Sequence, residues 1–133
     1  MSKTISVQCG HGVSLDGSWD SGCVYKGHTE AGLMLKITRA AVKYLRAAGV
    51  KVISDADHGN NKNMIEDVRW ANNVGCSLYV SIHCDYSGAP KGVMPLYVSG
   101  SGTVETAHRI FLKCAPLSLF FLRLALNCGN HPR

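Results

Sequence analysis

Two histidines and one glutamate supply the side chains that a catalytic zinc site requires. His11 follows a short apolar segment, Glu30 opens a long amphipathic segment, and His83 closes a second apolar segment. Two imidazoles and one carboxylate form a zinc ligand set that leaves one coordination position open. Zinc held in this way polarises a carbonyl group and activates water, so the chemistry that the trio suggests is hydrolysis of an amide.

Each member of this trio also has an ordinary structural interpretation. His11 lies between Gly10 and Gly12 and can be a turn residue. Glu30 can be a carboxylate at the start of a helix, and His83 can be a hydrogen-bonded core histidine. The spacing alone is therefore a hypothesis of a zinc site and not strong support for one.

Three further polar residues lie near the trio in sequence. His28 precedes Glu30 by two positions and is a rival ligand or a substrate contact. Asp85 follows His83 by two positions, so on a continuing strand it shares the same face and can orient a ligand. A loop aspartate at a strand end is the alternative for Asp85. Asp20 lies in a run of glycine and serine and is predicted to be a turn residue.

Strand and helix patterns alternate along the segments that must position these residues. Strands are predicted over 5–9, 50–54, 77–84 and 92–98, and helices over about 30–48, 64–74 and 104–114. The segment 77–84 is the most strand-like and is expected at the centre of the sheet. The alternation predicts an α/β fold, a single layered domain with a mostly parallel central sheet flanked by helices. Sites in such sheets form beyond the carboxyl ends of the strands, where His11 and His83 both fall.

The helix over 30–48 has the clearest boundaries. Thr29 can cap its start, and Gly49 ends it. Apolar residues recur at helical spacing and predict one buried face, made of Leu33, Met34, Ile37, Ala41, Tyr44, Leu45 and Ala48. A polar, glycine-rich loop is expected over 13–28, a polar loop over 55–63, and a strand or helix over the apolar segment 117–126.

The composition is that of one compact globular domain of 133 residues with a formal charge of +5. The charge suits an anionic partner, but the basic residues are scattered along the sequence without aromatic interleaving, so a nucleic-acid partner is not expected. No apolar stretch is long enough for a membrane span or a signal peptide, and cytoplasmic synthesis is expected. The six cysteines form no Cys-x-x-Cys pair, and we expect most of them to be reduced and buried.

The order of five motifs resembles the amidase-3 family, the zinc N-acetylmuramoyl-L-alanine amidases found among autolysins, spore-cortex enzymes and phage endolysins. The resemblance covers residues 4 to about 110. The motifs that carry it are Cys9-Gly10-His11-Gly12, Glu30 at the head of a helix, Arg69-Trp70-Ala71-Asn72, Ser81-Ile82-His83-Cys84-Asp85 and Gly92-Val93.

This resemblance implies a function and a site. It assigns zinc to His11, Glu30 and His83, and it gives Arg69 and Asn72 structural roles before the third strand. The implied reaction is cleavage of the amide between N-acetylmuramic acid and L-alanine, with peptidoglycan as partner. The expected organisation is a catalytic domain over 1–112 and a divergent or truncated tail of the same domain over 113–133. Without a signal peptide, the chain resembles a phage or prophage endolysin that leaves the cell through a holin-type pore and then acts on the cell wall.

One feature of the family pattern is missing. The family carries a catalytic glutamate on a strand near its C-terminus, whereas no acidic residue follows Glu105 in this sequence. The catalytic acid/base is therefore unassigned, and slow hydrolysis is expected. Two alternatives stay open: a zinc-containing module that binds peptidoglycan and cuts it poorly, and a zinc peptidase that cuts within the stem peptide.

Overall fold

A five-stranded sheet forms the centre of the molecule. The computed structural model describes residues 3–59, 61–84, 93–96 and 120–125. The sheet has the strand order β6-β1-β7-β9-β8, and its strands are β1 (Thr4–Cys9), β6 (Lys51–Ile53), β7 (Leu78–His83), β8 (Val93–Leu96) and β9 (Phe120–Ala125). Strand β1 runs parallel to β6 and β7, β8 runs parallel to β9, and β9 is antiparallel to β7. The predicted α/β fold with a mostly parallel sheet is confirmed, and β7 is its central strand as expected.

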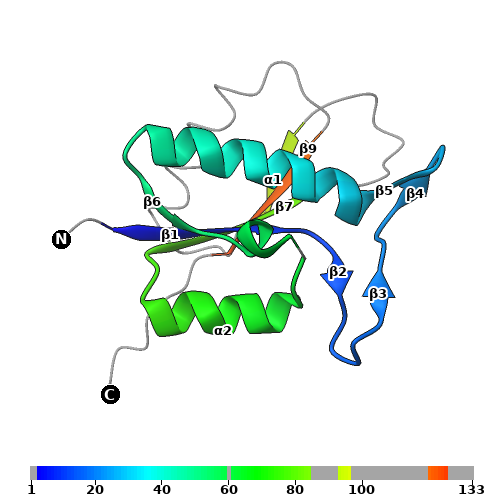
Figure 1. The fold of residues 1–133 in the computed structure, drawn as a ribbon, viewed down its shortest axis with the longest axis horizontal. Coiled ribbons are helices and arrows are strands. Elements are labelled where there is room, and N and C mark those ends of the chain that lie inside the picture. The colour runs from blue at the N-terminus through cyan, green and yellow to red at the C-terminus, as the bar shows by residue number, and fades with distance from the viewer. Residues whose placement is uncertain (1–2, 60, 85–92, 97–119, 126–133) are drawn as a thin grey trace.

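Two helices cover the two sides of this sheet. Helix α1 (Glu30–Ala47) lies on one side and α2 (Met64–Val74) on the other (Figure 1). Thr29 caps α1 by accepting a hydrogen bond from the Gly32 N–H at 3.2 Å, and Asn63 caps α2 by accepting one from the Ile65 N–H at 2.9 Å. The helix boundaries therefore agree with those predicted from the sequence.

The buried face of α1 differs from the predicted one. The buried residues of this helix are Glu30, Ala31, Met34, Thr38 and Val42. Leu33 and Tyr44 were expected in the core, but their exposed fractions are 36% and 74%, and Ala48 is also exposed. Apolar residues extend round more than half of α1, so the sequence pattern did not distinguish the side that meets the sheet from the side next to it.

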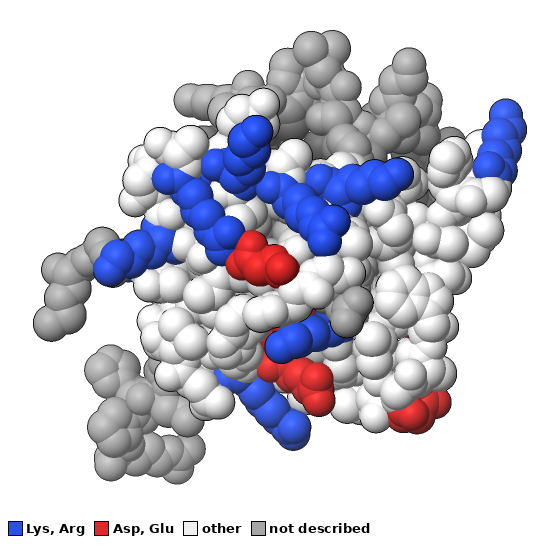
Figure 2. Space-filling view, viewed as in Figure 1, with Lys and Arg blue, Asp and Glu red and all other residues white. Residues whose placement is uncertain are grey.

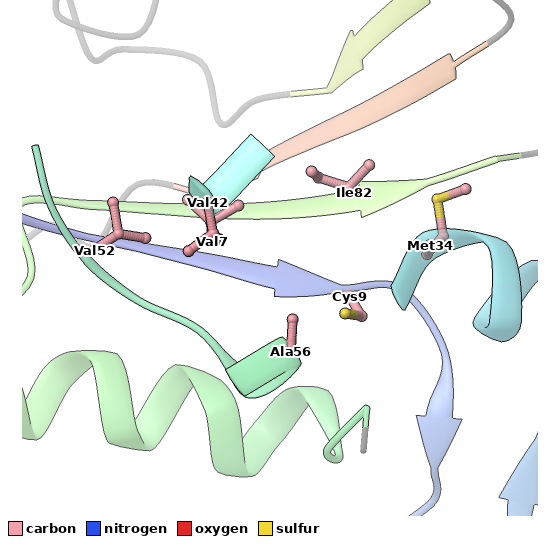
Figure 3. Packing of buried hydrophobic residues seen from close by; sticks show 7 residues of the cluster. All are labelled: Val7, Cys9, Met34, Val42, Val52, Ala56 and Ile82. Carbon is pink, nitrogen blue, oxygen red and sulfur yellow. The ribbon is translucent and has the colours of Figure 1, made fainter. Parts of the chain in front are cut away.

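The main hydrophobic core lies between α1 and the sheet. Its buried members, shown in Figure 3, are Val7, Cys9, Met34, Val42, Val52, Ala56 and Ile82. A second, smaller cluster of Ala71, Cys76 and Tyr79 lies where α2 meets the sheet. Burial of these side chains stabilises the sheet–helix layers by about 25 cal/mol per Å² of apolar surface.

The cysteines only partly match their prediction. Cys9, Cys23 and Cys76 are free thiols. Cys9 and Cys76 are buried as expected and Cys84 is half-buried, whereas Cys23 is exposed in a bend at the surface.

Both predicted polar loops contain secondary structure. Residues 13–28 contribute to two short antiparallel ribbons, which pair β2 (Gly12–Val13) with β3 (Trp19–Asp20) and β4 (Val24–Tyr25) with β5 (His28–Thr29). These ribbons extend from the carboxyl end of β1 towards the start of α1 (Figure 1). The other loop contains the 3-10 helix η1 (Asp55–His58), in which Asp55 and Ala56 are buried.

Several predictions concern residues outside the described ranges, namely the helix over 104–114, the ends of the strand over 92–98, and Asp85. The apolar segment 117–126 contains β9, so its described part is a strand. No helix in the described part of the chain is long and apolar enough to cross a membrane.

Candidate metal centre

His11, Glu30 and His83 meet at the carboxyl ends of β1 and β7. One ligand atom from each residue lies within 4.8 Å of the others. The Glu30 carboxylate lies between the two imidazoles, with Oε2 3.3 Å from His11 Nε2 and Oε1 3.2 Å from His83 Nδ1. The two rings stand edge to face with their centroids 5.0 Å apart. The fold thus brings together three residues that are spread over 72 positions of the sequence.

Two glycines make this close approach possible. A Cβ atom on Gly10 would lie 2.5 Å from His83 Nδ1, and one on Gly22 would lie 2.6 Å from His11 Cδ2 and 2.8 Å from Glu30 Oε2. Gly22 also has a φ of 63°, which disfavours other residues. His11 itself has a φ of 62°, an uncommon conformation for a residue with a side chain and one that concentrates at functional sites.

Each histidine has a second polar contact on the side of its ring that faces away from Glu30. Asp20 Oδ2 lies 2.9 Å from His11 Nδ1, and Ser81 Oγ lies 3.1 Å from His83 Nε2. When these ring nitrogens carry the protons, the lone pairs of His11 Nε2 and His83 Nδ1 point towards the Glu30 carboxylate. Partners of this kind fix the tautomer and the orientation of metal-binding histidines.

Glu30 is held as a charged carboxylate although it is 2% exposed. Burial raises its pKa, but the hydrogen bond with His83, the Cys23 N–H and the nearby His11 together lower the pKa below its usual value. The Cys23 N–H donates to Oε2 at 3.2 Å, and the Cys84 N–H donates to Oε1 at 2.9 Å. A buried carboxylate facing two histidines is suited to a cation.

The donor set fits zinc in type and spacing. Zinc–nitrogen and zinc–oxygen bonds of roughly 2.0–2.1 Å in a tetrahedron place neighbouring ligand atoms about 3.3 Å apart. His11 Nε2 lies 3.3 Å from Glu30 Oε2 and His83 Nδ1 lies 3.2 Å from Glu30 Oε1, so each imidazole is near this distance from one carboxylate oxygen. Three protein ligands also leave the fourth position for water or substrate, as in catalytic zinc sites.

The loop that follows β6 secures the backbone around this centre. The buried Asn61 side chain donates from Nδ2 to the Gly10 carbonyl at 3.3 Å and to the Ala31 carbonyl at 3.0 Å. The backbone carbonyl of Asn61 accepts from the Val13 N–H at 3.1 Å. One residue therefore contacts the chain on both sides of His11 and next to Glu30.

Asp55, from the same loop, ties it to β1. Its Oδ1 accepts from the Cys9 N–H at 3.0 Å and its Oδ2 from the Lys62 N–H at 3.2 Å, while its own N–H donates to Gln8 Oε1. These bonds fix the loop against the end of β1, two residues before His11.

Two hollows flank the centre. The apolar hollow, of about 760 Å³, is lined by Glu30 together with Cys23, Val24, Tyr25, His28, Leu33 and Cys84. The polar hollow, of about 220 Å³, includes His11 and His83 and is also lined by Ser14, Asp20, Lys62, Asn63 and Ser81. The three candidate ligands thus lie between the two hollows. A hollow of several hundred Å³ beside convergent polar groups is the usual form of a small-molecule site.

The other sequence candidates have different positions. His28 is exposed and lines the apolar hollow, which fits a substrate contact, but it is not a member of the His–Glu–His group. Asp20, predicted to be only a turn residue, contacts His11. Ser81 and Asn61 were not predicted to contribute, and only the Ser-Ile-His motif gave a signal for Ser81.

The fold and this group define a class of protein: a single α/β domain with a candidate metal centre at the carboxyl ends of its parallel strands. Two solved N-acetylmuramoyl-L-alanine amidases share the fold. The catalytic domain of CwlV from Bacillus (Paenibacillus) polymyxa var. colistinus has a TM-score of 0.67 and 17% identity, over 92% of this chain and 79% of that one. AmiC2 of Nostoc punctiforme has a TM-score of 0.68 and 19% identity, over 92% and 77%.

The chain belongs to the amidase-3 family. The family model, described as N-acetylmuramoyl-L-alanine amidase, matches residues 5–113. None of the curated proteins matches the sequence. The family prediction made from the motifs is therefore confirmed.

Proposed function

We propose that this chain is a zinc-dependent N-acetylmuramoyl-L-alanine amidase that acts on peptidoglycan in the cell wall. The observation that carries the proposal is the geometry of His11, Glu30 and His83, whose ligand atoms all lie within 4.8 Å of one another. Zinc bound there would polarise the scissile carbonyl and activate water for attack on it. Family membership supplies the substrate class.

The protein residues contribute orientation and charge to this reaction. The Asp20 carboxylate favours the His11 tautomer that leaves Nε2 open for a metal, and the Ser81 hydroxyl orients the His83 ring. Glu30 supplies the negative charge that balances the cation, and its backbone donors from Cys23 and Cys84 fix both carboxylate oxygens. The centre is thus preorganised before the substrate arrives, which lowers the cost of reaching the transition state.

The two hollows give the substrate a path across the centre. The scissile amide would lie over the three ligands, with one side of the substrate in the apolar hollow and the other in the polar hollow. Tyr25 and His28 then contact one side of the amide, and Lys62 and Asn63 the other. Such contacts hold the amide in a fixed orientation for attack.

Product analysis of purified peptidoglycan tests the reaction. An amidase releases the lactyl carboxylate of muramic acid together with a new N-terminal L-alanine, and mass spectrometry identifies both groups. A zinc peptidase that cuts within the stem peptide would instead leave L-alanine attached to muramic acid. That second product would overturn the proposed bond specificity while leaving the zinc site intact.

Metal analysis tests the ligand set independently of turnover. We expect one zinc per chain, with strong loss in His11→Ala and in His83→Ala. His28→Ala is the matched control, since His28 lies beside the centre but outside the ligand group, and it should keep its zinc. Full zinc retention by His11→Ala or His83→Ala would remove that residue from the ligand set.

A zinc-containing peptidoglycan-binding module that cuts slowly is a second candidate function. Strand β9, which pairs with β7 next to the centre, consists of Phe120-Phe121-Leu122-Arg123-Leu124-Ala125 and contributes no carboxylate. Zinc content and wall binding without release of lactyl groups would favour this candidate.

A further inference from the structure

Four basic residues form one stripe along the exposed surface of α1. Lys36, Arg39, Lys43 and Arg46 follow each other at intervals of three, four and three residues, and all four are exposed. This spacing places them on one side of the helix over a length of about 15 Å. Figure 2 shows Lys and Arg atoms gathered across the α1 side of the molecule. Residues that are scattered in the sequence thus form a continuous basic surface in the fold, which we call the basic stripe.

The basic stripe has little negative charge to balance it. After Glu30, α1 contains no acidic residue. Asp57 of η1 pairs with Arg46 through two short hydrogen bonds of 2.8 and 2.6 Å. Among the described residues, neither Lys36 nor Lys43 has an ion-pair partner. Exposed Lys51, next to the Val52 carbonyl that accepts from Arg46, extends the positive charge beyond the helix.

The two arginines of the stripe are held in place. Arg39 donates from Nε to the Ala56 carbonyl at 3.1 Å, and Arg46 is fixed by Asp57 and the Val52 carbonyl. Their side chains therefore lose less freedom on binding than free surface arginines do. Fixed arginines that alternate with lysines make a surface suited to a ligand with several negative charges along its length.

We propose that the basic stripe binds an anionic phosphodiester polymer linked to the peptidoglycan. The inference rests on the proposed function, which places the chain in the wall, and on the charge complementarity of the stripe. Glu30, at the start of α1, belongs to the metal centre, so the stripe begins about 9 Å along the helix from that centre and leads away from it. A polymer bound along α1 would keep the centre beside the peptidoglycan strand to which the polymer is attached.

Other polyanions fit the stripe less well. Proteins that bind single-stranded nucleic acid combine basic residues with aromatic platforms, and the stripe has no aromatic residue among its members. A helix that lies in a membrane surface inserts its apolar face, whereas the residues of α1 that face the sheet are occupied in the core. These partners serve as comparison arms in the test.

The test compares binding of three proteins to cell walls by co-sedimentation at low salt. Lys36→Gln/Lys43→Gln removes two charges from the stripe without touching the arginines that hold η1. Lys3→Gln/Asn73→Asp lowers the net charge by the same two units at exposed positions outside α1 and is the matched control. We expect Lys36→Gln/Lys43→Gln to bind walls roughly tenfold more weakly and Lys3→Gln/Asn73→Asp to bind like the parent chain.

Walls extracted with hydrofluoric acid, which removes phosphodiester polymers and leaves peptidoglycan, identify the partner. On these walls all three proteins should bind equally weakly. A difference that persists on extracted walls, an equal loss in Lys3→Gln/Asn73→Asp, or stripe-dependent binding only to anionic vesicles or DNA would each overturn the proposal. Cleavage of a soluble muramyl peptide should be the same in all three proteins. If none of the proteins cleaved this peptide, the proposed reaction would be wrong, and the wall-binding comparison would still decide the role of the stripe.

Discussion

At the scale of single residues, the candidate centre depends as much on the contacts around its ligands as on the ligands. Asp20 is exposed, yet its carboxylate makes two hydrogen bonds, one with His11 and one with the Gly22 N–H. Its hydrogen bond with His11 and the one it accepts from the Gly22 N–H lower its pKa, so it is charged at neutral pH. A charged partner on Nδ1 makes the opposite nitrogen of His11 a better metal ligand.

Asp20→Asn is predicted to weaken zinc binding by about 10- to 100-fold, because the amide keeps the shape of the contact and loses its charge. Asp16→Asn is the control, since Asp16 lies in the turn between β2 and β3 and bonds only to Ser18. Competition with a fluorescent chelator measures both affinities. Equal zinc affinity in the two variants would show that Asp20 serves the turn alone.

The sequence predicted the candidate ligands and missed their partners for a physical reason. His11 and His83 follow apolar strands, and Glu30 opens a capped helix, so each has a local pattern. Asp20 has the local pattern of a turn, and its contact with His11 appears only when the β2–β3 ribbon folds back.

At the scale of elements, the loop between β6 and α2 connects the parts that carry the ligands. Asn61 is fully buried and bonds to carbonyls at the end of β1 and in the first turn of α1. These two backbone segments carry His11 and Glu30. A change in this loop therefore reaches the metal centre without altering a ligand.

Asn61→Ala is predicted to destabilise the fold by about 1–3 kcal/mol and to weaken zinc binding, because it removes the side-chain donor that bonds to two buried carbonyls. Asn63→Ala provides the matched control. It removes the N-cap of α2, which should lower the free energy of unfolding by about 1 kcal/mol. The Asn63 side chain caps α2 and is not one of the bonds that hold the segments of His11 and Glu30. Denaturant unfolding and zinc titration are measured on both. Equal zinc affinities would mean that Asn61 is only structural.

Most elements were predictable because their signals are local. Helix α1 has its cap at Thr29 and a glycine after its end, and β7 is rich in strand-forming residues such as Tyr79, Val80 and Ile82. The buried face of α1 was not predictable, because Leu33 and Tyr44 lie on a side of the helix that is as apolar as the buried side. The basic stripe was likewise hidden, because its residues are three or four positions apart and adjacent only on the helix.

At the scale of the whole molecule, two buried carboxyl groups link stability to pH. Burial and, to a smaller extent, the charge of nearby Asp55 raise the pKa of Asp67 to about 8, although Lys62 opposes this effect. No donor among the described residues bonds to either Asp67 oxygen. Burial also raises the pKa of Asp55, although hydrogen bonds from Cys9 and Lys62 oppose the change. The folded chain thus keeps protons that the unfolded chain releases near pH 4.

The free energy of unfolding is therefore predicted to fall as pH rises from about 4 to about 8, by up to about 1.4 kcal/mol per unit for Asp67. Asp67→Asn should flatten much of this slope, because the amide has no proton to lose. Exposed Glu66→Gln is the control and should keep it. Urea unfolding at several pH values measures all three slopes, and an unchanged slope in Asp67→Asn would exclude this group as the cause.

The last prediction concerns the segment 113–133, which we interpret as a divergent tail of the same domain. Its described part, β9, pairs with β7, and the register sets Phe121 opposite His83. The family pattern carries its catalytic glutamate on a late strand, and here that strand offers no carboxylate beside the centre. Loss of a positioned acid/base typically lowers a rate by about 10²–10⁴-fold.

We therefore expect the chain to bind zinc and to release dye from labelled cell walls slowly. A version with a family-like C-terminal segment that includes its glutamate should be much faster, and a third version with that glutamate changed to glutamine should be slow again. Equal, robust rates in all three would show that another group, such as His28 or Asp85, carries the proton.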